Sequence, residues 1–271
     1  MICCDTHLHS AFSSDSEAPM EDMIKEGIRL GLKTICFTEH FDPDYPDNPE
    51  GLDFLPDFKN YKETLFTLKE KYAPEIEVLY GLEIGVQPHL GGTLSDFYRQ
   101  YGQDFDFIIN SCHIVKGMDP YDGVYFNEMT PHEGIETYFE TILSNLKVFP
   151  DYQAAGHLDY VCRYLPENSP LFVYGDFREI LDAILNEIIS AGKGLEVNTA
   201  GLKYGMDWPN PHISILKRYR ELGGEIITIG SDGHKPKHMA WEFQKLPGIL
   251  KKAGFSHYAI FRKKKPVFYK L

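Results

Sequence analysis

The chain has 271 residues, of which 43% are hydrophobic and 25% are charged. This length and composition are typical of a folded chain with a large core, and α/β barrels commonly reach this size as one domain. The formal net charge of −13 argues against non-specific binding to nucleic acid or to an anionic membrane surface. An anionic substrate would therefore need local positive charge, from metal ions or from a few arginines and lysines.

The five cysteines include no C-x-x-C pair, so we expect reduced and mostly buried thiols rather than disulfides. The N-terminus lacks the basic segment and apolar run of a signal peptide. No apolar run approaches the roughly 20 residues of a membrane span. We therefore expect a cytoplasmic protein that does not bind membranes.

Hydrophobic periodicity and turn residues predict strands that alternate with helices along the whole chain. The expected strands are 1–4, 33–38, 77–82, 105–110, 153–157, 194–198 and 225–230. The expected helices are 20–30, 58–72, 90–101, 132–149, 175–191, 212–222 and 246–253. Near the C-terminus we expect a short extended segment at 258–261, followed by a basic, solvated terminus at 262–265.

Strands that alternate with helices imply parallel pairing through right-handed crossovers. The pattern favours an α/β barrel, although an open doubly wound sheet would give a similar alternation. No internal repeat, low-complexity stretch or linker interrupts the sequence, so we expect a single domain over residues 1–271. The loop 42–56 carries four prolines, and loops of this length in compact enzymes are often lids or substrate walls.

The first stretch that carries chemistry is Asp5-Thr-His7-Leu-His9, directly after the opening apolar run. Side chains alternate along an extended strand, so Asp5, His7 and His9 should point to one side. Neutral imidazole is the commonest protein metal ligand, and a second carboxylate follows at Asp15. An H-x-H pair alone can also be an ordinary hydrogen-bonding pair, so the prediction of a metal site depends on what the other strands supply.

Six of the seven expected strands deliver an imidazole or a carboxylate at their carboxyl ends. In parallel α/β folds these ends converge at the edge where active sites lie. Each residue alone has an ordinary structural explanation, but six convergent positions by chance are improbable. The candidate ligands are His7, His9, Asp15, His40, Glu83, His113, His157, Asp232 and His234.

Imidazole and carboxylate ligands without thiolate favour zinc, iron or manganese over copper(I) or iron–sulfur clusters. The candidates are too many for one tetrahedral ion and suit two or three divalent ions that share carboxylates. Such clusters activate water near neutral pH and stabilise both the attacking and the leaving oxygen of a phosphoryl transfer. The residues therefore predict a metal centre suited to phosphoryl transfer.

Several short motifs carry these candidates in chain order. They are Asp5-x-His7-x-His9, Thr38-Glu-His40, Gly81-Leu-Glu83, Ser111-x-His113, Gly156-His-Leu-Asp159 and Gly230-Ser-Asp-Gly-His234. Together they resemble the PHP (polymerase and histidinol phosphatase) family, and within it the chain is most similar to stand-alone histidinol-phosphate phosphatases. The resemblance implies a distorted seven-stranded (β/α)7 barrel, like a TIM barrel, with a trinuclear centre at the C-terminal edge of the strands.

The resemblance also implies which residues hold each ion. One ion would take His7, His9, Glu83 and Asp232. A second would share Glu83 and add His113 and His157, and the third would take Asp15, His40 and His234. Arg163 resembles the family's phosphate-binding arginine, and Lys203 lies where a second cation for phosphate is expected.

The expected activity is that of a metal-dependent phosphomonoesterase of histidine biosynthesis that hydrolyses L-histidinol phosphate to L-histidinol and phosphate. Arg163 and Asp232 would belong to the catalytic centre, and His234 or a water would assist the leaving alkoxide. Asp42 and Tyr45 in the long loop are candidates for contacts with the amine and imidazole of this small phosphorylated substrate.

Two alternatives stay open. One is another PHP phosphoesterase, such as a protein-tyrosine phosphatase or a nuclease, and the other is a non-catalytic metal-binding barrel. The acidic chain has no basic stripe, which counts against a nuclease because binding to a phosphate backbone needs clustered lysines and arginines. We therefore expect no nucleic-acid partner, and we make no prediction of the oligomeric state.

Overall fold

The computed structural model describes residues 2–48, 50–127, 129–169 and 172–271, so Met1 of the first expected strand lies outside the described residues. Within these ranges seven strands form one parallel sheet in chain order. They are β1 (Cys4–Leu8), β2 (Thr34–Phe41), β3 (Glu77–Gly85), β4 (Phe107–Ser111), β5 (Ala154–Ala155), β6 (Gly194–Asn198) and β7 (Ile227–Gly230). β2 and β3 extend further than expected, and β1 begins at Cys4, where the expected strand 1–4 ended, so that prediction was displaced. His7, His40 and Glu83 therefore lie inside strands.

The sheet curves until its first and last strands meet. The backbone N–H of Asp232 donates to the carbonyl of His7 at 3.0 Å, and the N–H of His9 donates to the carbonyl of Gly233 at 3.1 Å. The hydroxyl of Thr6 also donates to the carbonyl of Ile229. The sheet is therefore a nearly closed barrel and not an open doubly wound sheet.

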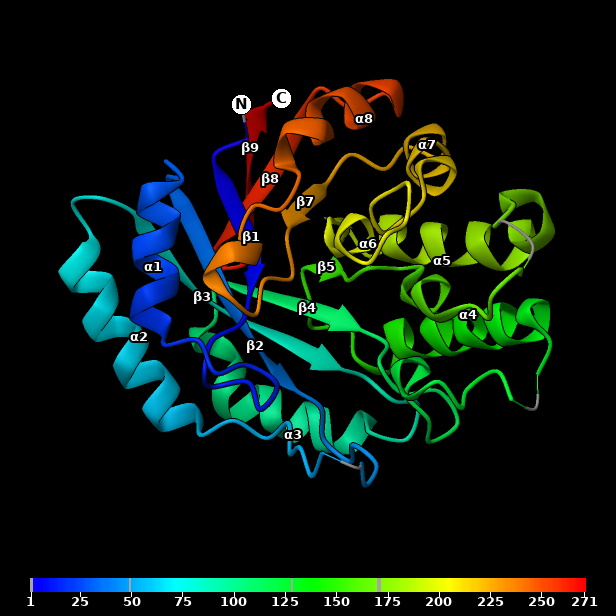
Figure 1. The fold of residues 1–271 in the computed structure, drawn as a ribbon, viewed down its shortest axis with the longest axis horizontal. Helices are drawn as coiled ribbons and strands as arrows, with labels where there is room; N and C mark the ends of the chain where they lie inside the picture. The colour runs from blue at the N-terminus through cyan, green and yellow to red at the C-terminus, as the bar shows by residue number, and fades with distance from the viewer. Residues whose placement is uncertain (1, 49, 128, 170–171) are drawn as a thin grey trace.

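Helices pack around the outside of this barrel (Figure 1). They are α1 (Met20–Arg29), α2 (Phe58–Tyr72), α3 (Gly91–Tyr101), α4 (Pro131–Val148), α5 (Arg178–Ser190), α6 (Ala200–Lys203), α7 (Ile213–Glu221) and α8 (Leu246–Lys252). The short α6, directly after β6, was not expected. α4 shows how sequence sets a boundary: Thr130 and Glu133 form a capping box around Pro131 in the first turn.

The C-terminal segment is an antiparallel hairpin of β8 (His257–Arg262) and β9 (Lys265–Lys270), and it covers the N-terminal end of the barrel. The ring of Phe261 stacks on that of Phe107 at a centroid distance of 5.4 Å. Arg262 Nε donates to Glu77 Oε1 at 2.7 Å, at the start of β3. The expected extended segment is confirmed. The run 262–265 is solvated in part, since Lys263 and Lys265 are exposed, but it is not a free terminus, because it forms the hairpin turn and Arg262 binds the barrel.

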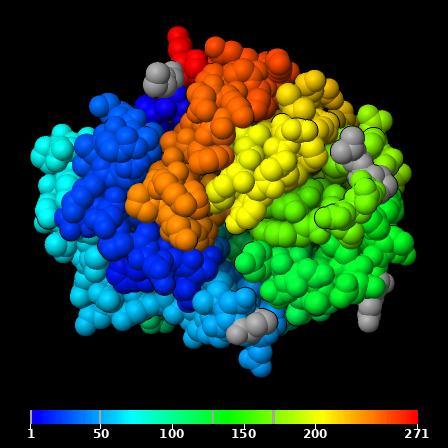
Figure 2. All heavy atoms as spheres, in the orientation of Figure 1, coloured from blue at the N-terminus to red at the C-terminus, as the bar shows by residue number. Residues whose placement is uncertain are grey.

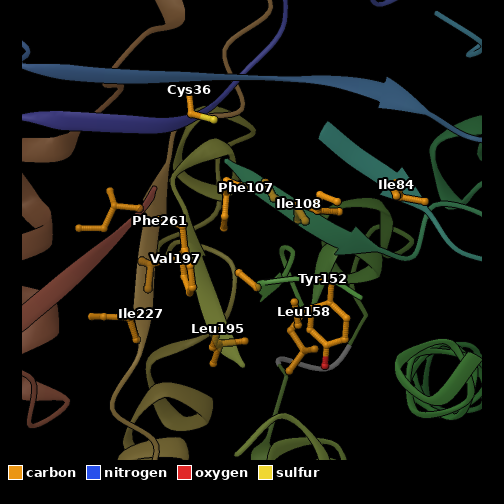
Figure 3. Close-up of a cluster of buried hydrophobic side chains, with 14 of the residues drawn as sticks. Cys36, Ile84, Phe107, Ile108, Tyr152, Leu158, Leu195, Val197, Ile227 and Phe261 are labelled. Atoms are coloured by element: carbon orange, nitrogen blue, oxygen red, sulfur yellow. The ribbon is translucent and has the colours of Figure 1, made fainter. Parts of the chain in front are cut away.

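The apolar core lies next to this hairpin. In Figure 3, Phe107, Val197, Ile227 and Phe261 come together from four different strands; each is at most 4% exposed. The five cysteines are free thiols, as expected. No helix in the described part of the chain is long and apolar enough to cross a membrane.

Candidate metal centre

All nine predicted ligands lie together at the carboxyl ends of the strands. In four sets of three side chains, the potential ligand atoms lie within 4.8 Å of one another. Three sets combine predicted ligands only: His7/His9/Asp232, Glu83/His113/His157 and His9/His40/His234. The fourth contains Asp42 with His40 and His113. Because the sets share members, they form one continuous cluster.

Glu83 occupies the middle of this cluster and is fully buried. Its Oε1 lies 2.9 Å from His157 Nε2 and 3.2 Å from His113 Nε2. Its Oε2 lies 3.0 Å from His7 Nε2 and 3.4 Å from His9 Nε2. Burial alone would raise the pKa of Glu83, but the imidazoles of His7 and His113 hold it well below the ordinary range. His40 Nδ1 also lies 3.2 Å from Oε2. The two oxygens of one carboxylate thus face two separate groups of imidazoles, as a bridging ligand requires.

The imidazoles are oriented by carboxylates behind them. Glu196 Oε1 lies 2.5 Å from His7 Nδ1, and Glu196 Oε2 accepts from the backbone N–H of His157 at 2.8 Å. Asp42 Oδ1 lies 2.5 Å from His113 Nδ1. A carboxylate in this place accepts the hydrogen of Nδ1 and leaves the Nε2 lone pair free for a metal.

His9 is oriented through a serine. The hydroxyl of Ser13 donates to Glu39 Oε2 at 2.6 Å and accepts from the backbone N–H of His40 at 3.0 Å. Because its one hydrogen goes to Glu39, Ser13 must accept from His9 Nδ1, which lies 3.1 Å away. The Nε2 lone pair of His9 therefore faces the cluster. Burial raises the pKa of Glu39 to about 7, although Ser10 and Ser13 donate to its carboxylate and oppose this shift.

The geometry of this cluster fits bound cations. His7 Nε2 and His9 Nε2 lie only 3.1 Å apart. Both carry lone pairs when Nδ1 holds the hydrogen, and two lone pairs at this distance repel each other. A divalent ion beside them would bind both, and imidazole with carboxylate is a donor set that such ions prefer.

Asp15, His40 and His234 form the outer part of the cluster. Asp15 Oδ2 lies 2.9 Å from His234 Nε2 and 3.6 Å from His40 Nε2. The rings of His40 and His234 both stack on His9, at centroid distances of 4.1 and 4.2 Å. This arrangement agrees with the group of ligands that the family resemblance implies for a third ion.

Asp5 does not join the cluster, although the alternation of side chains places it in line with His7 and His9. Its carboxylate accepts from the N–H and the hydroxyl of Ser231 at 2.9 and 2.6 Å, and from the N–H of Ala240 at 2.8 Å. The expectation that Asp5 contributes to the metal site is wrong, because its oxygens are occupied by donors near β7. Asp5 instead holds the segment that presents Asp232.

Arg163 and Lys203 lie beside Asp232. The guanidinium of Arg163 is 2% exposed, and its Nη1 lies 3.4 Å from Asp232 Oδ2. Asn210 accepts from its Nε at 2.7 Å, and Asn198 accepts from its Nη2 at 3.3 Å. Lys203 Nζ donates to the backbone carbonyl of Asp232 at 3.1 Å. Burial alone would lower the pKa of Arg163, but Asp232 raises it, so the cation is retained.

The two loop residues expected at the substrate, Asp42 and Tyr45, both line the cavity but have different partners. Asp42 is 3% exposed, and its contact with His113 suits the orientation of a ligand. Tyr45 lines the cavity, and its hydroxyl donates to Asp119 Oδ2 at 2.8 Å. A substrate contact by Asp42 stays a prediction. Asp119, which accepts from the Tyr45 hydroxyl, is a further carboxylate that lines the cavity.

Sequence reasoning assigned no role to three carboxylates: Glu39, Glu196 and Asp119. Glu39 and Glu196 are buried inside apolar strands, where an ionisable residue is itself a signal. β6 was also the one expected strand without a candidate ligand. Asp119 lies in a turn-rich loop among several other acidic residues, so the sequence gave no reason to choose it.

A cavity of about 480 Å³ opens over the cluster. In Figure 2 the dark blue, green, yellow and orange segments that line it meet on one face of the molecule. Its polar lining includes Asp15, His40, Asp119, Arg163, Lys203 and His234, and its aromatic lining includes Tyr45, Tyr121, Tyr160 and Tyr164. A small phosphorylated molecule would fit this volume, with its anionic group near Arg163.

The fold and the site together define an α/β barrel with a divalent metal centre at the carboxyl ends of its strands. The family described as the PHP domain matches residues 5–200, which include seven of the nine predicted ligands. The chain belongs to the PHP domain family.

Several proteins similar to this chain are named phosphatases. The histidinol-phosphatase of Lactococcus lactis is 33% identical over 261 residues, which are 95% of this chain and 93% of that protein. A probable histidinol-phosphatase of Clostridium acetobutylicum is 32% identical over 89% of each chain. The crystal structure of the Lactococcus lactis histidinol phosphate phosphatase, complexed with zinc, L-histidinol and phosphate, covers 97% of this chain and 98% of its own, with a TM-score of 0.87.

Proposed function

We propose that this protein is a metal-dependent phosphomonoesterase that hydrolyses L-histidinol phosphate to L-histidinol and phosphate, a step of histidine biosynthesis. The observation that carries the proposal is the cluster around Glu83, where the two oxygens of one carboxylate face two groups of imidazoles beside a buried arginine side chain. The similarity to a histidinol-phosphatase over 95% of the chain supports the choice of substrate.

Two or three divalent ions, zinc, iron or manganese, would occupy the cluster. His7, His9, Glu83 and Asp232 would hold one ion, Glu83, His113 and His157 a second, and Asp15, His40 and His234 a third. Ions bound in such a cluster lower the pKa of water and stabilise charge on phosphoryl oxygens. The sets His7/His9/Asp232 and Glu83/His113/His157 support the first two groups, and the contacts of Asp15 with His40 and His234 support the third.

The chain's own residues would bind and orient the phosphate. Arg163 would pair its guanidinium with two non-bridging oxygens, because a planar fork matches phosphate geometry. Its contacts with Asn198 and Asn210 fix the plane of the guanidinium before substrate arrives. Lys203 would add a point charge. A water would deliver a proton to the leaving alkoxide oxygen, or His234, which is 20% exposed at the cavity, would do so if it holds no ion.

The decisive experiment compares kcat/KM for histidinol phosphate with kcat/KM for a phosphotyrosine peptide. We expect a strong preference for histidinol phosphate with protein loaded with Zn²⁺ or Mn²⁺. A preference for the peptide would replace the proposal with a protein-tyrosine phosphatase. No phosphate release from either compound, or from p-nitrophenyl phosphate, would support a non-catalytic metal-binding barrel.

A further inference from the structure

Asp119 is a buried carboxylate in the cavity wall, and its charge has no partner. It is 5% exposed, and its oxygens accept from the hydroxyls of Tyr45 and Tyr160 at 2.8 and 3.1 Å and from the N–H of Tyr121 at 2.8 Å. These donors are neutral, and no lysine, arginine or histidine in the described ranges forms an ion pair with Asp119 within 4.0 Å. A buried carboxylate without a cation is costly unless a ligand supplies one.

Three segments that frame the cavity meet at Asp119. It precedes the short turn of helix at Pro120–Asp122, while Tyr45 comes from the loop 42–56. Tyr160 begins the turn that follows His157, and its ring lies 5.1 Å from the imidazole of His157. Asp119 therefore lies one side chain away from the metal centre without touching a predicted ligand.

Tyr160 separates Asp119 from the phosphate-binding arginine. The guanidinium of Arg163 lies over the Tyr160 ring at 5.0 Å from its centroid, whereas Asp119 binds the hydroxyl of the same ring. The cavity thus has a cation over the ring of Tyr160 and an anion at the hydroxyl of the same side chain. A molecule with a phosphate and an ammonium group only a few bonds apart would match this separation of charge.

We propose that Asp119 binds the ammonium group of the substrate and thereby selects phosphate esters of amino alcohols over aryl phosphates, which carry no ammonium group. The proposal rests on the proposed function and names the group by which the substrate is recognised. An ammonium would form charge-assisted hydrogen bonds with a carboxylate that Tyr45 and Tyr160 already hold in place. An aryl phosphate would leave that charge buried and unpaired, so the same residue would both attract one substrate and disfavour the other.

The test is Asp119→Asn, measured with histidinol phosphate and with its deamino analogue, 3-(imidazol-4-yl)propyl phosphate. We expect kcat/KM for histidinol phosphate to fall roughly 30-fold or more, since one charge-assisted pair is lost, while kcat/KM for the analogue changes little. Asp151→Asn is the control, because Asp151 is an exposed carboxylate that is not among the residues lining the cavity. It should leave both values almost unchanged.

The outcomes separate this proposal from the proposed function. A wild-type protein that does not prefer histidinol phosphate over p-nitrophenyl phosphate overturns the proposed function. A wild-type protein with that preference, but an Asp119→Asn variant that loses both substrates equally, overturns the role of Asp119. Should the variant fail to fold, inhibition of the wild type decides: L-histidinol must inhibit more strongly than 3-(imidazol-4-yl)propanol, and equal inhibition would refute recognition of the ammonium.

Discussion

The two ends of the barrel carry different kinds of side chains. At the N-terminal end the hairpin β8–β9 closes the barrel with stacked aromatic rings and the Arg262–Glu77 ion pair. At the C-terminal end the strands present buried histidines and carboxylates, and the Nε2 atoms of His7 and His9 repel each other when neither carries a hydrogen. One end stabilises the fold, and the other end holds a set of potential metal ligands close together. Changes at the two ends should therefore separate stability from activity.

Removal of metal should have the largest effect, because it affects the whole C-terminal end. Exhaustive chelation should abolish phosphatase activity and lower Tm, since ions that bind only the folded state stabilise it by about 4 kcal/mol at a thousand times Kd. Activity assays and thermal melts before chelation, after it and after readdition of Zn²⁺ measure this. Full activity in protein shown to be free of metal would refute a metal-dependent mechanism.

Glu83→Gln should come next. An amide has nearly the same shape but no charge, so the two ions that Glu83 would bridge repel each other more strongly. We expect loss of at least one ion per chain and a fall in kcat of several orders of magnitude, with an unchanged circular dichroism spectrum.

His234→Asn is the comparison for Glu83→Gln, because it affects only the outer ligands. It should keep the bridged pair of ions and cost less activity. Metal analysis of both variants checks this. A Glu83→Gln variant with full metal content and most of its kcat would show that Glu83 is not the bridge.

Phe261→Ala tests the opposite end. Its side chain is 4% exposed and stacks on Phe107, so truncation should lower the free energy of unfolding by about 3–5 kcal/mol and leave kcat of the folded, metal-loaded protein unchanged. Urea denaturation at a fixed metal concentration measures the free energy of unfolding.

Phe268→Ala is the matched control, since Phe268 lies on the same hairpin but is 48% exposed. It should change the free energy of unfolding by no more than about 0.5 kcal/mol. A large loss of kcat in Phe261→Ala, without loss of stability, would contradict the division between the two ends.

Arg163→Ala should reduce activity less than Glu83→Gln and should act on binding. Loss of a charge-assisted pair to a buried dianion costs about 2–5 kcal/mol, and we expect it mainly as a higher KM for phosphate esters. Arg163→Lys should restore only part of the affinity for phosphate esters, because an ammonium cannot form the planar, paired contact. Steady-state kinetics on both variants measure this, and unchanged kinetics in Arg163→Ala would place the residue outside the site.

The sequence predicted the C-terminal end of the barrel better than the N-terminal end. Histidines after successive strands are rare enough to reveal a site, and the parallel arrangement brings strand ends together without knowledge of side-chain packing. The hairpin was missed because a lysine-rich terminus resembles a solvated tail, whereas its role depends on a contact between Arg262 and Glu77 that only the closed barrel creates.

Within the site, the sequence indicated which residues converge but not which residues support them. The role of Glu196 depends on its distance from His7 Nδ1. Asp5 alternates with His7 along the same strand but does not join the cluster, because donors near β7 surround its carboxylate. Asp42 and Asp119 are both acidic residues of turn-rich loops. Spacing alone does not separate them, because their partners come from other parts of the chain.

The closure of the barrel has a consequence for the order in which the protein assembles. Thr6 and Ile229, which bond across the seam, are separated by 223 residues, and the histidines of β1 meet Asp232 only after this loop has closed. During synthesis Asp232 is made 223 residues after His9. The complete centre would therefore form only after β7 and the segment that follows it have left the ribosome, and ions bound across the seam would act as a reversible crosslink. Amide hydrogen exchange at His9 and Asp232 would report how strongly that crosslink stabilises the contact between the first and last strands of the barrel.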